Sequence, residues 1–243
     1  MSTPHESENA RGNVHGDETR HAIILAAIRV IAEQGVSGAS LRAINVAAGC
    51  RNSSASHYHF GTKLAVIDAA LSTVYAEVDA GQAPLMSDLE LRVSQGRPVG
   101  VREVLEAAYL PFLALMTRPD YGPAAAKFFS RILVESDDQL QAVLNRLVAP
   151  MMLRCLALLQ SALPQVPEPV LRRRLFITVT NVVHGAGDMP AAANSPLGDL
   201  TSGNPLEMLH ELFDYMTAAI SAAPQPLTPA DEARMAATLF GQG

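Results

Sequence analysis

The side chains best suited to metal chemistry lie close together near residue 50 of the sequence. Cys50, His57 and His59 are residue types that bind transition metals. Residues two positions apart on a helix point about 200° apart, so His57 and His59 do not readily share one ion. Only one thiol and no carboxylate lie near them. Metal binding is therefore the weaker interpretation of these residues, and the sequence predicts no metal and no cofactor.

A serine hydrolase is a second chemical interpretation of the same segment. Ser53, Ser54 and Ser56 lie within a few residues of His57, which could act as a base. The sequence contains no Gly-x-Ser-x-Gly elbow between a strand and a helix, the usual setting of such a serine. A helical enzyme thus stays open only as a minor alternative.

Positive charge is concentrated in this segment, although the whole chain of 243 residues has a formal net charge of -6. From Gln34 to Ile67 there is no Asp or Glu, whereas Arg42, Arg51 and Lys63 are present. A locally positive surface on an acidic body is sufficient to contact nucleic-acid phosphates. The charge pattern therefore favours nucleic-acid binding by this segment.

The elements that would position these side chains are helices. Apolar spacing predicts a first helix over residues 18–34 and a fourth over 63–78, with two short helices between them. Ser40 and Thr62 are suitable N-caps, and Gly35 and Gly49 are suitable helix ends. A long helix followed by two short helices across a tight turn predicts a helix-turn-helix.

The exposed face of the second short helix would carry polar side chains able to bond to bases or phosphates. Small residues at 47–49 would let the two short helices pack closely. The predicted DNA-contacting residues are Arg42, Arg51, Asn52, Ser53, Ser54, Ser56, His57, His59 and Lys63.

From Thr19 to Leu71 the sequence resembles the TetR family of transcriptional regulators. The resemblance rests on Glu33-Gln34-Gly35, Ser40-Leu41-Arg42-Ala43-Ile44, Ala47-Ala48-Gly49 and Tyr58-His59-Phe60-Gly61-Thr62-Lys63. It implies phosphate contacts from His57, His59 and Lys63, with Tyr58 and Phe60 chiefly packing. Ser56 stands where the family usually has an apolar residue, which implies that one packing contact is weakened or replaced.

The predicted fold is all-α, with an N-terminal helix-turn-helix DNA-binding domain joined to a larger helical ligand-binding and dimerisation domain. The Gly- and Pro-containing stretch after residue 80 and the later Pro cluster suggest the divisions. The expected parts are a disordered tail at 1–16, the DNA-binding domain at 17–80, a linker at 81–100, the helical domain at 101–222 and a tail with a short helix at 223–243.

Dimerisation is expected through two helices of the second domain. Apolar residues recur at spacings of three and four within Pro169–His184 and Leu206–Ala222, as in a helix bundle. Each stripe could instead face its own core. A homodimer would suit a palindromic duplex with one helix-turn-helix for each half-site.

A small-molecule pocket is expected between Val101 and His184, where large apolar residues and a few polar ones occur. An ordinary core is the alternative explanation for each apolar residue. The predicted ligand-binding residues are Phe112, Met116, Phe128, Arg131, Met152, Phe176, Asn181 and His184.

Together these patterns predict a sequence-specific DNA-binding regulator, a repressor released by a small-molecule inducer. The alternative is a constitutive DNA-binding protein without a ligand. No window approaches 18 uninterrupted apolar residues, and the polar N-terminus does not resemble a secretory signal. We expect a cytoplasmic protein without a membrane span, in which Cys50 and Cys155 are ordinary thiols.

Overall fold

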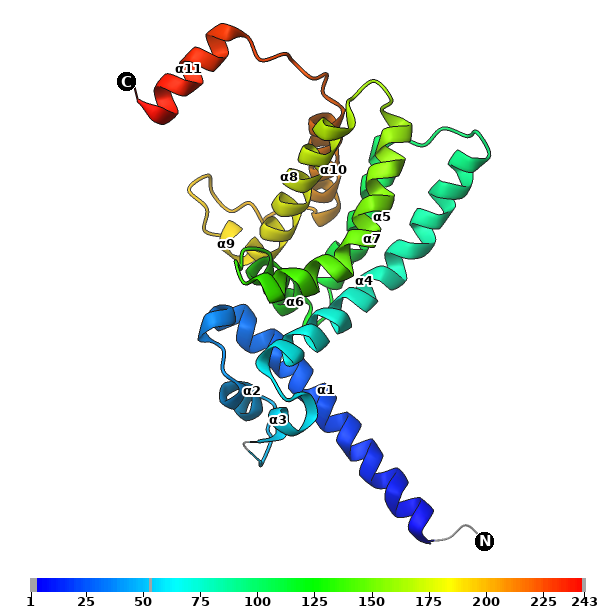
Figure 1. Cartoon of the computed structure of the whole chain (residues 1–243), viewed down its shortest axis with the longest axis vertical. Helices are drawn as coiled ribbons and strands as arrows, with labels where there is room; N and C mark the ends of the chain where they lie inside the picture. The colour runs from blue at the N-terminus through cyan, green and yellow to red at the C-terminus, as the bar shows by residue number, and fades with distance from the viewer. Residues whose placement is uncertain (1–3, 53, 242–243) are drawn as a thin grey trace.

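A computed structural model of the protein describes residues 4–52 and 54–241, and these residues form eleven α-helices and no strand (Figure 1). The predicted all-α fold is confirmed. The helices are α1 (Pro4–Gly38), α2 (Leu41–Ala47), α3 (Ala55–Phe60), α4 (Lys63–Ser94), α5 (Val101–Leu115), α6 (Gly122–Leu133), α7 (Asp138–Ala162), α8 (Glu168–Gly187), α9 (Met189–Ala192), α10 (Pro205–Ser221) and α11 (Pro229–Phe240).

The first four helices form the predicted helix-turn-helix unit, at the lower end of the molecule in Figure 1. The apolar face of α1 is buried, and Gly35 interrupts its helical geometry with a φ of 73°. The Ser40 hydroxyl accepts from the Ala43 N–H at 3.1 Å, and the Thr62 hydroxyl accepts from the Ala65 N–H at 3.1 Å. These caps satisfy N–H groups at helix starts that have no intrahelical partner, as the sequence predicted.

The helix α1 begins earlier than expected. It starts at Pro4, so residues 4–16 are helical, whereas the sequence predicted a disordered tail over 1–16; residues 1–3 lie outside the described part. Extending an existing helix costs less free energy than nucleating a new one. Glu6, Ala10 and Arg11 also have good helix propensity, which supports this extension.

The predicted linker over 81–100 is largely wrong, because α4 continues to Ser94 and only 95–100 join it to α5. The propensities of Gly81 and Pro84 suggested a break, but packing on α5 and α7 overrides them. A Cβ on residue 81 would lie 2.9 Å from the Pro111 Cβ, so glycine permits the close approach of α4 and α5. Pro84 lies on the exposed side of α4.

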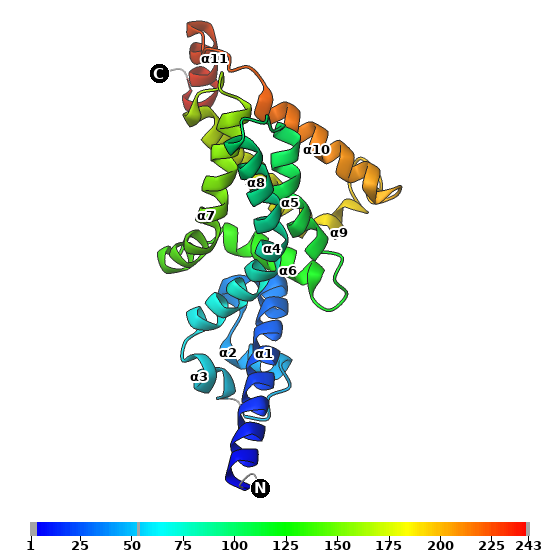
Figure 2. The same cartoon turned by 90° about the vertical axis from the view of Figure 1, so that its right-hand side faces the viewer.

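In the larger domain, α5 and α7 pack against α4, and α6 and α7 pack against α8 (Figures 1 and 2). The short helix α6 contacts both α1 and α8, so it joins the helix-turn-helix unit to the larger domain. The Arg29 guanidinium adds a contact by donating to the Asp120 carbonyl at 3.3 Å. By length and composition alone, α7 is apolar enough to cross a membrane; here it packs against α4, α5, α6 and α8.

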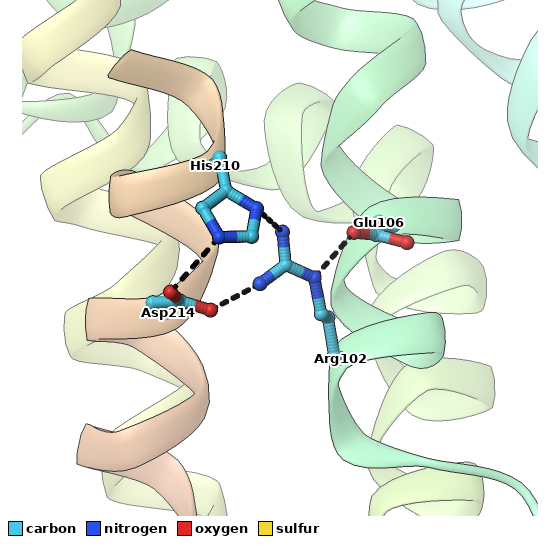
Figure 3. A network of polar contacts seen from close by, with 4 residues as sticks. All are labelled: Arg102, Glu106, His210 and Asp214. Atoms are coloured by element: carbon cyan, nitrogen blue, oxygen red, sulfur yellow. Dashed lines mark hydrogen bonds and ion pairs between the residues drawn. The ribbon is translucent and has the colours of Figure 1, made fainter. Parts of the chain in front are cut away.

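A network of polar contacts links α10 to α5 (Figure 3). Arg102 of α5 donates to Glu106 at 2.7 Å and forms an ion pair with Asp214 of α10. Arg102 also lies 3.0 Å from His210 Nδ1, and His210 Nε2 lies 3.3 Å from Asp214. Because the Arg102 guanidinium contacts Glu106 on α5 and both His210 and Asp214 on α10, it stabilises the position of α10 against α5.

The apolar stripes predicted to form a dimer seam are largely buried within the protomer. In α10 the side chains of Phe213, Met216 and Ile220 are buried, and in α8 those of Leu171 and Leu175 are buried. These residues therefore face the core of their own protomer, as in the alternative explanation, whereas Leu206 at the start of the α10 stripe is exposed. Exposed apolar residues on these helices include Ile177 and Tyr215, which lie outside the predicted stripes.

The last helix, α11, projects from the rest of the molecule after a proline-containing segment (Figure 1). Thr228 caps it by accepting from the Asp231 N–H at 3.1 Å, as its sequence predicted. None of the described side chains of α11 is buried. The helix therefore adds nothing to the core.

Candidate nucleic-acid interface and ligand cavity

A buried polar contact fixes α2 against α3. The Ser56 N–H donates to Asn45 Oδ1 at 2.9 Å, and the Ser56 hydroxyl donates to the same oxygen. Ser56 is 0% exposed, so its side chain does not reach a base edge, and its predicted role in DNA contact is wrong. The resemblance implied that a packing contact is weakened or replaced at this position, and the contact found there is this hydrogen bond.

The predicted polar face is otherwise present on the surface of the helix-turn-helix. Arg42 of α2, Arg51 and Asn52 in the turn, Ser54 and His57 are all exposed. Ser53 lies outside the described residues. The Ser54 N–H donates to Asn52 Oδ1 at 2.9 Å, which shapes the turn. This surface combines guanidinium, amide, hydroxyl and imidazole groups, all of which can bond to bases or phosphates.

Aromatic residues at the end of α3 differ in their exposure. Tyr58 is 86% exposed, so the expectation that it chiefly packs is wrong. Phe60 does pack against the core, and the Arg20 guanidinium lies over its ring, 5.0 Å from the centroid. Tyr58 and Phe60 are two positions apart, which is about 200° around a helix, so they face nearly opposite sides. Sequence reasoning therefore missed one aromatic group on the candidate interface.

The two histidines of α3 have different surroundings. His57 Nδ1 lies 2.7 Å from the Gly61 carbonyl, which accepts a hydrogen bond from it when this nitrogen carries the proton. His59 is half-buried and contacts the Tyr58 ring edge-on, with ring centroids 5.2 Å apart. Within residues 4–52 and 54–241 no group of three metal-ligating side chains occurs.

Lys63 lies at the junction of α1 and α4. Its ammonium donates to the Val36 carbonyl, and its side chain is half-buried. The sequence assigned this residue to a DNA phosphate, and that role stays a prediction. The structure adds a second role, because the ammonium satisfies a carbonyl near the end of α1.

A cavity of about 580 Å³ lies in the larger domain between α4, α5, α6, α7 and α8. This volume is within the usual range of small-molecule sites. The exposed lining residues Asn145, Leu153 and Phe176 mark its mouth between α7 and α8. Buried lining residues from α4 and α5 form its floor, including Val78, Gln82, Ala108, Tyr109 and Phe112.

Three of the predicted ligand-binding residues, Phe112, Met152 and Phe176, line this cavity. The other five lie outside the lining and are corrected here: Met116, Phe128, Arg131, Asn181 and His184. Phe128 is fully buried in the core, whereas Arg131 and Asn181 are exposed elsewhere. His184 Nδ1 is bonded to the Ser130 hydroxyl at 2.6 Å, where it joins α8 to α6.

Two buried polar groups of the lining were missed by sequence reasoning. Gln82 and Tyr109 are only 7% and 6% exposed, and neither Gln82 Oε1 nor the Tyr109 hydroxyl has a hydrogen-bonding partner among the described residues. Gln82 fell within the predicted linker, so the sequence did not mark it as a polar residue on the apolar face of a helix. Buried polar groups normally find partners, and among the described residues these two atoms have none.

Burial keeps the ionisable groups of the floor uncharged. Burial raises the pKa of the Cys155 thiol to about 12. Burial, and secondarily the nearby Cys155, raises the pKa of the Tyr109 hydroxyl well above its ordinary value. Tyr109 therefore retains its proton at neutral pH and can act as a hydrogen-bond donor.

The arrangement defines a class of protein: a helix-turn-helix protein whose helical second domain encloses an apolar cavity. Residues 106–219 match the family model described as the tetracyclin repressor-like C-terminal domain. Together with the fold, this match confirms the resemblance seen in the first 71 residues. The second domain therefore matches the model of the TetR C-terminal domain, and the chain as a whole is similar in fold to TetR-family transcriptional regulators.

Solved structures of transcriptional regulators share the fold over most of the chain. A transcriptional regulator from Rhodococcus sp. Rha1 is 20% identical, with 84% of this chain and 99% of that chain covered and a TM-score of 0.58. SmeT, the repressor of the Stenotrophomonas maltophilia multidrug efflux pump SmeDEF, is 24% identical, with 87% and 100% covered and a TM-score of 0.52. No curated protein matches the sequence significantly.

Proposed function

We propose that this protein is a cytoplasmic, homodimeric repressor that binds a palindromic duplex through α3 and releases it when a small molecule occupies the cavity. The observation that carries the proposal is the polar, partly cationic surface formed by Arg42, Arg51, Asn52 and His57 on the acid-free part of an acidic chain. The repressor SmeT, which has the same fold, supports this output. The proposed activity is binding, without catalysis.

The proposed role of each residue on this surface, base contact or phosphate contact, follows from its position. Arg51 and Asn52 lie at the turn before α3, where side chains enter the major groove and meet base edges. His57 and Tyr58 lie on α3 itself and are exposed. Lys63 follows at the start of α4, where helix N–H groups also attract phosphate.

Release is proposed to work through α4 and α6. The first turn of α4 adjoins the helix-turn-helix, and further along the same helix Tyr75, Val78 and Gln82 line the cavity. Phe129 and Leu133 of α6 also line the cavity, and α6 packs against α1. A ligand that favours one arrangement of these helices shifts the spacing of the two recognition helices in a dimer and lowers the population that fits DNA.

The dimer is proposed to use the outward faces of α8 and α10, which lie side by side (Figure 1). Arg174 of α8 joins the pair by donating to the Ile220 carbonyl at 2.8 Å. Exposed apolar groups at Ile177 and Tyr215 are available to a second copy of the chain. A two-fold dimer presents one α3 to each half-site of a palindrome.

The direct test is selection of bound duplexes from a random pool, followed by titration of the recovered sequence by fluorescence anisotropy. A shared inverted repeat, bound at least tenfold more tightly than shuffled DNA, is expected. A chemically diverse library is then screened for loss of this anisotropy. Absence of any preferred duplex contradicts the regulator proposal, and binding that no compound relieves favours the constitutive alternative.

A further inference from the structure

Two residues with unpartnered polar atoms, Gln82 and Tyr109, lie on the otherwise apolar floor of the cavity. Gln82 Nε2 donates to the Ala108 carbonyl of α5, which fixes the orientation of the amide. Because only the nitrogen can donate, Oε1 is the remaining group, and it accepts hydrogen bonds only. Tyr109, the next residue along α5, adds a protonated hydroxyl to the same lining.

The surroundings of Gln82 and Tyr109 are uncharged. The neighbouring floor consists of apolar or neutral side chains such as Val78, Phe112, Met151 and Leu156. The charged residues of the lining are Glu135 and Arg172, which are not part of the buried floor. A charged ligand group at Gln82 would lose its hydration without gaining an opposite charge.

We propose that the cavity binds an uncharged, mainly apolar molecule whose single polar head both donates to Gln82 Oε1 and accepts from the Tyr109 hydroxyl. Alcohols, phenols and primary amides have this chemistry; ketones lack the donor, and carboxylates lack both the donor and neutrality. The apolar body of the ligand extends towards the mouth between α7 and α8. The inference rests on the proposed function only in taking this cavity as the effector site.

An opposite orientation, with an anionic head at the mouth on Arg172, is disfavoured by the contacts of that residue. The Arg172 guanidinium is exposed and already forms an ion pair with Glu168 of the same helix. An ion pair in water contributes little to affinity. That orientation would also leave Gln82 Oε1 and the Tyr109 hydroxyl buried against a hydrocarbon chain.

The test is calorimetric titration of the full-length protein with probes that share a ten-carbon skeleton. 1-Decanol and decanamide are expected to bind, whereas 2-decanone binds about three- to tenfold more weakly because one hydrogen bond is missing. Decanoate at pH 7.5 is expected to bind at least tenfold more weakly than 1-decanol. The ranking decanol and decanamide above decanone and decanoate is the signature of the proposed head-group site.

Variants locate the site within the cavity. Tyr109→Phe removes only a hydroxyl and leaves the ring in place, so it should weaken 1-decanol binding about three- to tenfold. Gln82→Leu should reduce the difference between 1-decanol and 2-decanone to less than twofold. The matched control Gln139→Leu on α7 changes an exposed residue outside the lining and should leave every affinity unchanged.

Four outcomes overturn the inference. Tightest binding by decanoate, lost in Arg172→Gln, would place an anionic head at the mouth. Equal affinities for all four probes, or an unchanged affinity of Tyr109→Phe for 1-decanol, would show that the head group does not contribute to recognition. Failure of every probe to bind a protein that still binds its selected duplex would also overturn the inference while sparing the DNA-binding proposal. Binding of 1-decanol without release of the duplex would instead contradict only the effector role.

Discussion

Asn45 and Ser56 hold the two short helices of the helix-turn-helix together from the inside. The Ser56 N–H and hydroxyl both donate to Asn45 Oδ1, the former at 2.9 Å, and both residues are buried. Asn45 Oδ1 thus accepts hydrogen bonds from two buried donors, the Ser56 N–H and the Ser56 hydroxyl. The orientation of α3, and of every side chain it presents, therefore depends on a residue that does not face DNA.

Asn45→Ala is expected to lower the free energy of unfolding by about 1–3 kcal/mol, because it strips the acceptor from two buried donors. Ser56→Ala keeps the backbone hydrogen bond and should cost about 1 kcal/mol. Ser54→Ala changes an exposed side chain on the same segment and should stay within about 0.5 kcal/mol of wild type. Urea unfolding followed by circular dichroism measures this order, and equal stability of Asn45→Ala and Ser54→Ala would refute it.

Local signals in the sequence were sufficient to predict this part of the fold. Ser40 and Thr62 cap helices through their own hydroxyls, and Gly35 adopts a positive φ, so each acts within a few residues of its place in the chain. The course of α4 through Gly81 and Pro84 was not predictable in this way. There the packing of α5 and α7, distant in sequence, decides the conformation.

The two cysteines are expected to differ sharply in reactivity. Burial raises the pKa of the Cys155 thiol to about 12, so at pH 8 only about one molecule in ten thousand carries the thiolate at this residue. Cys50 is half-buried near the surface of the helix-turn-helix. Iodoacetamide at pH 8 should alkylate Cys50 at least a hundredfold faster than Cys155 in the folded protein, as followed by peptide mass spectrometry. In 6 M urea the two rates should converge, and equal rates without urea would contradict the buried placement of Cys155.

The ligand site shows why residue types alone locate a cavity only in part. Phe128 and Phe129 are neighbours of the same type on α6, yet Phe128 fills the core whereas Phe129 lines the cavity. The helical periodicity of the sequence places both residues near an apolar face of α6, but it does not show which part of that face other helices cover. Gln82 and Tyr109 can be assigned to one cavity only from the contact between α4 and α5, which are distant in sequence.

Arg51 is expected to contribute to base recognition. Arg51→Ala should cost about 1–3 kcal/mol on the selected duplex and less on shuffled DNA, because a guanidinium at a base edge discriminates between sequences. Arg97→Ala removes the same charge from the exposed loop after α4, at the far end of that helix from the helix-turn-helix, and is the matched control. Anisotropy titrations of both variants at several salt concentrations measure the difference. Equal losses on selected and shuffled DNA would show that Arg51 contacts phosphate only.

The dimer proposal predicts opposite results for two glutamate variants. The Ile177→Glu, Tyr215→Glu double variant places charge on the exposed faces of α8 and α10, so it should yield folded monomers at micromolar concentration by sedimentation. Phe213→Glu instead buries a charge at a position that is 2% exposed, and it should lose helical structure rather than dissociate into folded subunits. Circular dichroism distinguishes the two results. Folded monomers from Phe213→Glu would mean that the predicted seam faces a partner after all, and a wild-type protein that sediments as a monomer would contradict the dimer itself.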